Sequence, residues 1–249
     1  VLTLYLTRIV GFTDIEVGFI GAVFYGGLYL FPPFAGAISD RIGFKNGLIL
    51  AFGLLTGGYF FLGVLHSKPV VLLLLFIIMV GGSFIKPLIT GTVAKTTNEA
   101  NRARAYSLFY WVVNIGAFGG KTVVPSIRQG IGLEYVNFFS AGMSVLALIV
   151  ALLLFKPMDH DQERKSLLDV FRSLWSILIT PRLIGLTIIV AGFWTIQAQL
   201  YATMPKYVIR LVGEDAKPEW IANVNPFVVV CCVVLITQLI KDWQPAKAI

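Results

Sequence analysis

The sequence predicts an all-α polytopic membrane protein, and three observations lead to this fold class. Of the 249 residues, 57% are hydrophobic and only 13% are charged, whereas a soluble domain carries about 25% charged residues. The mean hydropathy is +0.82. The apolar residues also gather in blocks of about 20, which is the helix length that crosses a hydrocarbon layer about 30 Å thick.

These blocks predict seven membrane-spanning helices. Five blocks lack charge altogether: Val17–Ser39, Gly47–Leu65, Tyr135–Phe155, Leu183–Pro205 and Trp220–Ile240. Pro69–Ala94 is interrupted only by Lys86, and Ala105–Gly120 continues past Lys121 to about Ile127. The N-terminal "VLTLYLTRIVGF" is apolar but too short to span, so we interpret it as the end of a further, truncated helix. We therefore expect the chain to be part of a longer protein.

The net charge of +7 is explained by membrane topology. Threading the helices in alternation places twelve Lys and Arg residues on one side and six on the other. Such an excess marks the cytoplasmic side. Since the charges are used in this way, no basic stripe is left for nucleic acid, and we expect a multi-pass protein of the cell (inner or plasma) membrane.

The loops divide the chain into three predicted segments. Residues 1–155 form an N-terminal six-helix bundle, residues 156–182 a cytoplasmic linker, and residues 183–249 the first two helices of a second bundle, as in transporters built from two related halves. The linker clusters His160 with two aspartates, which we interpret as a solvated loop and not as a metal site. Its later part predicts an amphipathic helix on the inner membrane surface, although it could simply begin the next span. The apolar positions are Leu167, Leu168, Phe171, Leu174, Trp175 and Leu178.

A charged cluster, "GAISDRIGFK" (36–45), lies at the cytoplasmic end of the first complete span. Gly36 allows close helix approach, Asp40 lies at the membrane boundary, and Gly43 permits a sharp reversal between Arg41 and Lys45. Ion pairs from such a cluster can hold two bundles together on one side of the membrane. A loop that merely stops translocation would explain Arg41 and Lys45, but not the offsets of the glycines and the aspartate.

This cluster resembles the signature between helices two and three of the major facilitator superfamily. Other stretches narrow the resemblance to proton-coupled oligopeptide transporters. They are "GGSFIKP" in helix four, "YSLFYWVVNIGAF" (106–118) in helix five, "FW" in helix seven and "NVNPF" in helix eight. The resemblance covers essentially the whole chain and implies a fold of two six-helix bundles, with gating by Gly36, Asp40, Arg41, Gly43 and Lys45.

Lys86 is the most informative single residue. A lysine at the centre of a spanning helix costs about 2.5–3.5 kcal/mol on insertion scales, so it normally faces a cavity or a partner. It lies nine residues before Lys95, about 13 Å from the inner helix end, and snorkelling to the interface is the alternative. By resemblance, Lys86 pairs with carboxylates of helix one, responds to proton binding and attracts a substrate carboxylate.

The resemblance also implies a substrate pocket. Its residues are Tyr29, Lys86, Asn114, Trp194, Gln197 and Asn225. The chain departs from the family in helix seven, where "FWTIQAQLY" has Gln197 and Ala198 in the place of acidic residues. Glutamine forms hydrogen bonds but carries no proton, so proton coupling would depend on segments outside this chain or would be altered.

These features predict a secondary active transporter that takes up di- or tripeptides, or a similar zwitterionic solute, with protons by alternating access. One alternative is a facilitator-fold exporter of lipophilic or anionic compounds. Another is a membrane scaffold or sensor that keeps the fold without transporting. We expect no enzymatic activity, cofactor, metal or nucleic-acid partner, and a monomer or weak oligomer in the bilayer.

Overall fold

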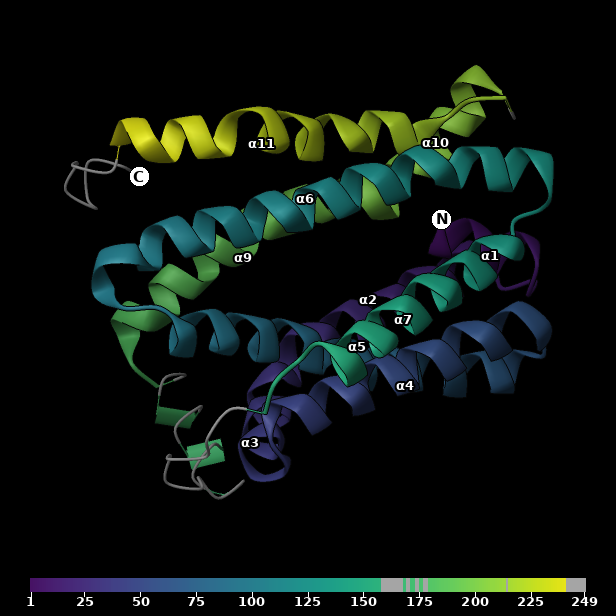
Figure 1. Ribbon diagram of the computed structural model, residues 1–249. Coiled ribbons are helices and arrows are strands. Elements are labelled where there is room, and N and C mark those ends of the chain that lie inside the picture. Colours follow the sequence, from purple (N-terminus) through teal and green to yellow (C-terminus); the bar gives the residue numbers. More distant parts are fainter. Residues whose placement is uncertain (158–167, 169–170, 173–174, 177–178, 214, 241–249) are drawn as a thin grey trace.

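The computed structural model describes residues 1–157, 168, 171–172, 175–176, 179–213 and 215–240 (Figure 1). Every regular element in these residues is a helix, as the sequence predicts. The helices are α1 (Leu2–Arg8), α2 (Asp14–Leu30), α3 (Pro32–Ile42), α4 (Phe44–Val64), α5 (Lys68–Thr96), α6 (Glu99–Gly130), α7 (Tyr135–Leu153), α9 (Pro181–Ala202), α10 (Met204–Val212) and α11 (Pro218–Ile240).

The linker predictions fall mostly outside the described residues. This applies to the cluster around His160 and to Leu167, Leu174 and Leu178. Leu168, Phe171 and Trp175 are described; they lie in helical backbone and are exposed.

The expected first span, Val17–Ser39, is wrong as a single straight helix. The structure divides it into α2 and α3, which meet at a bend of 45°. Pro32 and Pro33 follow the break directly, and α3 begins at Pro32. A proline lacks the N–H that a continuous helix needs at that position and clashes with the preceding turn, so α2 ends at Leu30 and a new helix starts.

By length and hydropathy, α4, α5, α7, α9 and α11 can each cross a membrane, and the α2–α3 pair is a sixth candidate span in the described part of the chain. The seventh expected span corresponds to α6. Lys121 and the charged residues at both ends lower the hydrophobicity of α6. Its 32 residues nevertheless exceed the roughly 20 that a span requires. The predicted span Leu183–Pro205 is also shortened, because α9 ends at Ala202 and Pro205 lies in the first turn of α10.

Within the predicted N-terminal bundle, α4 packs closely against α5 and α7. Glycines permit this approach. A Cβ added at Gly58 would lie 2.5 Å from Cγ1 of Ile78 on α5, and one at Gly63 would lie 2.8 Å from the ring of Phe138 on α7. Small residues at helix interfaces let backbones approach within a bilayer, where burial of apolar groups provides little drive for association.

Adjacent glycines of α4 provide a direct test of this packing. We expect Gly58→Ala to destabilise the protein by about 1–3 kcal/mol, since overpacking forces neighbouring side chains to move. Gly57→Ala is the matched control, because a Cβ there would meet nothing within 4 Å and the gain in helix propensity is the same. Thermal unfolding in detergent measures both. Equal melting temperatures for the two variants would contradict the close α4–α5 contact.

The two halves of the chain meet along α6 and α11, which lie side by side over much of their length (Figure 1). The Trp111 indole N–H donates to the Val230 carbonyl at 2.9 Å, and the Ser107 hydroxyl donates to that of Thr237 at 3.2 Å. Since α6 belongs to the first half and α11 to the second, this α6–α11 seam joins the predicted bundles.

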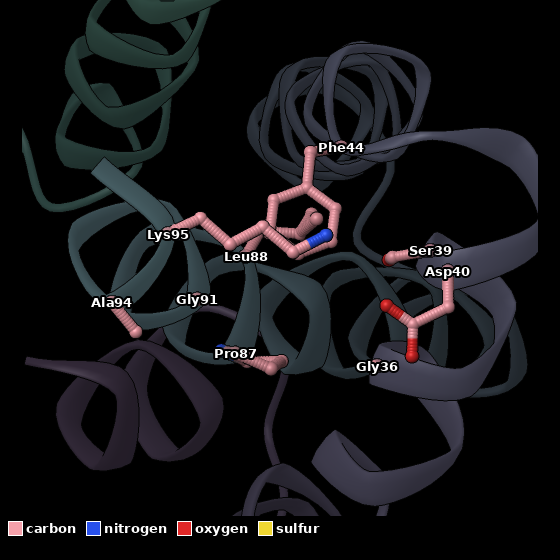
Figure 2. A pocket seen from close by; sticks show the side chains of 9 residues that line it. All are labelled: Gly36, Ser39, Asp40, Phe44, Pro87, Leu88, Gly91, Ala94 and Lys95. Carbon is pink, nitrogen blue, oxygen red and sulfur yellow. The ribbon is translucent and has the colours of Figure 1, made fainter. Parts of the chain in front are cut away.

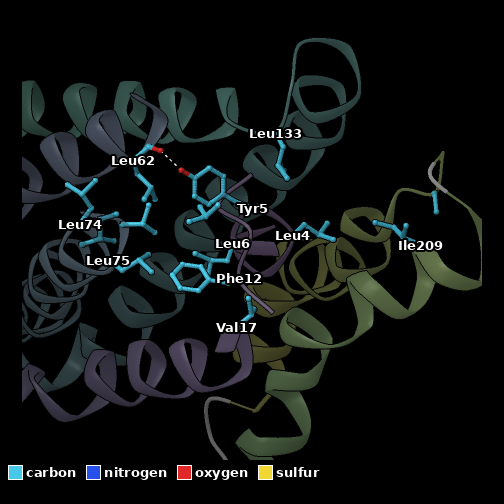
Figure 3. Close-up of a cluster of buried hydrophobic side chains, with 14 residues drawn as sticks. Leu4, Tyr5, Leu6, Phe12, Val17, Leu62, Leu74, Leu75, Leu133 and Ile209 are labelled. Carbon is cyan, nitrogen blue, oxygen red and sulfur yellow. Dashed lines mark hydrogen bonds between the residues drawn. The ribbon is translucent and has the colours of Figure 1, made fainter. Parts of the chain in front are cut away.

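A hydrophobic cluster packs α1, α2, α4 and α5 together with α10 (Figure 3). It includes Leu6 and Phe12 near α1, Leu62 of α4, and Ile209 of α10 from the second half. The Tyr5 hydroxyl donates to the Leu62 carbonyl inside this cluster. The positive-inside assignment places this cluster outside, so apolar packing joins the two halves at the outer surface.

Candidate functional site

Lys86 occupies the middle of α5, between long apolar stretches. Its side chain is exposed, and it forms no ion pair within the described residues. The Thr90 hydroxyl, one turn further along, donates to the Lys86 carbonyl at 2.7 Å. The following residue, Pro87, lies inside the helix and removes one N–H from its ladder. The structure therefore presents an unpaired ammonium group at membrane depth.

Polar residues predicted for the pocket lie on α6, α9 and α11. Gln197 is partly buried, three residues after the half-exposed Trp194 on α9. Asn225 is exposed on α11. The Asn114 amide donates to the Tyr110 carbonyl of its own helix at 2.8 Å, which leaves its carbonyl oxygen available as an acceptor. Tyr29 lies apart from these residues, close to the bend after α2, with 66% of its surface exposed.

Lys121 brings these three helices together. Its Nζ lies 3.2 Å from the Ala222 carbonyl oxygen of α11 and 3.4 Å from the Tyr201 hydroxyl of α9. The same nitrogen lies 4.8 Å from the centroid of the Tyr201 ring, within the range of a cation–π interaction. Sequence reasoning placed Lys121 inside a helix but gave it no role, since only the fold shows what faces it.

Asn223, which was not among the predicted pocket residues, is a buried amide of α11. Its Nδ2 donates to the Thr122 hydroxyl at 2.9 Å and to the Phe118 carbonyl at 3.2 Å. The position of Asn223 two residues before Asn225 on a helix puts them on different faces. The sequence motif "NVNPF" contains both, and helical spacing alone could not decide which one faces α6.

The charged cluster 36–45 lies at the inner ends of α3 and α4 (Figure 2). Gly43 joins the two helices with φ of 90°, a conformation that favours glycine, as expected for a sharp reversal. Gly36 faces Pro87, but an added Cβ would make only an ordinary contact at 3.8 Å. A cavity of about 280 Å³ lies between α3 and α5, and Asp40 and Lys95 both line it.

The basic residues of this cluster have contacts inside the first bundle. Lys45 donates to the Leu152 carbonyl in the last turn of α7 at 2.9 Å, where a cation satisfies a free carbonyl and the helix dipole. Lys95 lies over the Phe44 ring at 4.3 Å. Lys45 therefore ties α4 to α7, while a latch to the other half by Asp40 or Arg41 stays a prediction.

Charged residues at the outer ends connect the two halves. Arg128 of α6 donates through Nε to Glu219 of α11 at 2.9 Å, and both side chains are only 7% exposed. Arg128 also donates to the Ala216 carbonyl at 2.9 Å. The sequence contains both partners, but it gives no indication that residues 91 positions apart form a buried pair.

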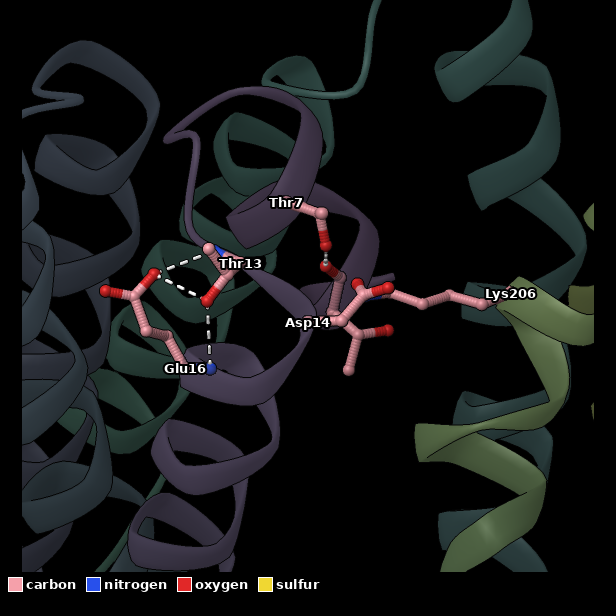
Figure 4. A network of polar contacts seen from close by, with 6 residues as sticks. Thr7, Thr13, Asp14, Glu16 and Lys206 are labelled. Carbon is pink, nitrogen blue, oxygen red and sulfur yellow. Dashed lines mark hydrogen bonds and ion pairs between the residues drawn. The ribbon is translucent and has the colours of Figure 1, made fainter.

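A second outer pair joins α2 to α10. Lys206 lies 2.5 Å from Asp14 (Figure 4). Asp14 is held at the start of α2 by a capping box in which Thr13 and Glu16 exchange hydrogen bonds, an arrangement that fixes the first turn of a helix. Together with the pair at Arg128, it closes the outer ends of the two halves against each other in this conformation.

The sequence pattern described as "Major Facilitator Superfamily" matches residues 1–249. The chain belongs to this superfamily. It is a multi-pass plasma-membrane protein with the all-helical facilitator fold, so the predictions of fold class and localisation are confirmed.

Curated relatives include two proteins named for drug resistance. The chain is 24% identical over 224 residues to the quinolone resistance protein NorA of Staphylococcus aureus, covering 86% of this chain and 55% of the relative. It is 24% identical over 187 residues to the multidrug resistance protein MdtH of Photorhabdus laumondii, covering 75% and 46%. The chain thus spans about half the length of the curated relatives that it matches.

Solved structures of a peptide transporter POT share the fold. The complex with alafosfalin superposes with a TM-score of 0.73 at 18% identity, covering 98% of this chain and 64% of the other. The complex with sulfate gives a TM-score of 0.68 at 16% identity, covering 98% and 65%. These similarities show that the chain shares the fold of this transporter.

Proposed function

We propose that the protein to which this chain belongs is a secondary transporter for small zwitterionic solutes, with di- and tripeptides as the first candidates. It carries them inward with protons by alternating access between the two halves. Lys86 is the observation that supports this proposal most directly. An exposed ammonium in the middle of an apolar helix is costly unless it serves a solute, an ion or a partner.

The remaining polar groups suit a zwitterion. Asn114, Gln197 and Asn225 offer amide donors and acceptors from three different helices, whereas the described spans bring no carboxylate next to them. A site of this composition binds the peptide bond by hydrogen bonds and the carboxylate by charge. Protons then reach the site through Lys86 and carboxylates from parts of the protein outside this chain.

Outer closure supports alternating access. The pairs at Arg128 and Lys206, with the apolar cluster around Leu6, hold the two halves together at the outer surface. In a transporter of this fold, a conformation closed outside corresponds to one arrangement of two rocking halves. The solute then enters when these contacts separate and leaves toward the cytoplasm when they re-form.

Export of lipophilic compounds is the second candidate function. The names of the curated relatives NorA and MdtH point to drug resistance. Gln197 and Ala198 also occupy the positions where the peptide transporters that this chain resembles carry acidic residues. In addition, Phe19, Phe76 and Met79 line an apolar groove between α2 and α5. These observations favour an apolar substrate over a peptide.

Reconstituted full-length protein distinguishes the two functions. Proteoliposomes with an imposed inward proton gradient should accumulate labelled dialanine, and an uncoupler should abolish this accumulation. The same vesicles, assayed for movement of a fluoroquinolone, should show none. Fluoroquinolone transport without dialanine uptake would replace the peptide proposal by the export function, and transport of neither would favour a scaffold.

A further inference from the structure

Lys121 is a second cation at membrane depth, and the proposed function has not used it. It lies nine residues before the outer end of the 32-residue α6, about 13 Å from that end. Its amine is partly buried, and its partners are the neutral Tyr201 hydroxyl, the Tyr201 ring and the Ala222 carbonyl. In the part of the chain that the structure describes, no carboxylate forms an ion pair with it.

The location of Lys121 relates it to the candidate pocket. Asn114 precedes it by seven residues, two helical turns, and so lies on the same face of α6. Its partners are placed likewise: Tyr201 follows Gln197 by four residues on α9, and Ala222 precedes Asn225 by three on α11. On each helix the predicted pocket residue lies one or two turns to the inner side of the Lys121 contact.

We propose that Lys121 is a substrate-binding residue that receives the carboxylate of the solute at the outer end of this polar face. The inference rests on the proposed function and names the anionic group that the site selects. An ammonium has three donors, and neutral acceptors satisfy it less well than a carboxylate does. A carboxylate arriving from the inner side replaces the longer contact to Tyr201 and neutralises the charge.

This binding role makes a different prediction from a purely structural one. If Lys121 only ties α6 to α9 and α11, its loss weakens the protein and slows the transport of every solute equally. If it binds the carboxylate, its loss affects only solutes that carry one. A solute pair that differs in this group, dialanine and dialanine amide, separates the two roles.

The experiment uses full-length protein in proteoliposomes, with Lys121→Met, Lys121→Arg and the control Lys217→Met. Lys217 also lies over an aromatic ring, that of Trp220 at 5.5 Å, but it is exposed on the outer loop. We expect Lys121→Met to raise KM for dialanine about ten- to a hundredfold, as for loss of a hydrogen bond to a charged group, with kcat nearly unchanged. KM for the amide should stay the same, Lys121→Arg should retain most of the affinity, and Lys217→Met should match the wild type.

Equal losses for dialanine and its amide would overturn the proposal and leave Lys121 as a structural contact. If the wild type takes up no dialanine, the proposed function fails, and a second measurement decides on Lys121. Thermal unfolding is then followed with sodium acetate against chloride at equal ionic strength. An acetate-dependent stabilisation that Lys121→Met abolishes and Lys217→Met retains supports an anion site at Lys121. The same response in all three proteins, including no response, contradicts it.

Discussion

Replacing Lys86 with methionine should abolish proton-driven uptake while leaving the protein folded. Methionine keeps much of the length of the side chain but removes the charge, so packing around α5 changes little. The proposed function requires Lys86 to bind a carboxylate, and loss of a hydrogen bond to a charged group costs about 1.5–3 kcal/mol, which corresponds to a loss of about ten- to a hundredfold. Uptake of labelled dialanine by proteoliposomes under an imposed proton gradient measures the effect.

Two controls make this result specific. Thr90→Val alters the next turn of α5, where the hydroxyl donates to the backbone carbonyls of Lys86 and Pro87, and should retain most of the uptake. Exchange of labelled for unlabelled solute without a proton gradient separates coupling from binding. If Lys86→Met keeps wild-type uptake, Lys86 has no part in the mechanism, whatever its depth in the membrane.

Breaking the Arg128–Glu219 pair should produce the largest loss of stability. Both side chains are 7% exposed, and Glu219→Ala leaves the Arg128 guanidinium buried with the Ala216 carbonyl as its remaining acceptor. Removing one partner of a buried pair costs about 3–5 kcal/mol, because the other charge is left uncompensated. Thermal unfolding of the full-length protein in detergent measures this loss.

The double variant Arg128→Met with Glu219→Leu tests why the single change is harmful. Well-packed apolar residues often replace a buried ion pair without loss, so much of the stability should return. The outer ends should nevertheless separate more often, because the apolar pair lacks directional contacts. Labelling of a cysteine introduced at Ala216 reports this opening. A single variant as stable as the wild type would show that the pair does not hold the two halves together.

The sequence was sufficient for the fold class and for most helices, because block length and charge distribution are local properties. Pro32 and Pro33 could have predicted the break between α2 and α3, but the continuous apolar run around them favours a single span. The predicted span from Ala105 to about Ile127 includes Lys121, but α6 extends further at both ends, from Glu99 to Gly130, because the polar residues there continue the helix beyond the apolar block.

The candidate site was less predictable, because it depends on which helices become neighbours. Lys86 can be recognised from the sequence alone, since it is the only charged residue in the long apolar block Pro69–Ala94. Arg128, Glu219 and Asn223 cannot, because each lies near a helix end or beside another polar residue. Their partners are 91 to 105 positions away in the chain, and no local pattern encodes such pairs. The roles of Tyr29, Asn114, Trp194, Gln197 and Asn225 stay predictions.

The α6–α11 seam has a consequence for how the protein is made. Trp111 and Arg128 meet partners that are 119 and 91 positions later in the chain. At about 5–20 residues per second of synthesis, these groups wait roughly 5–25 seconds inside or beside the translocation machinery before α11 arrives. Biogenesis therefore includes an interval in which the first half has been made while the Trp111 indole and the Arg128 guanidinium still lack their partners on α11.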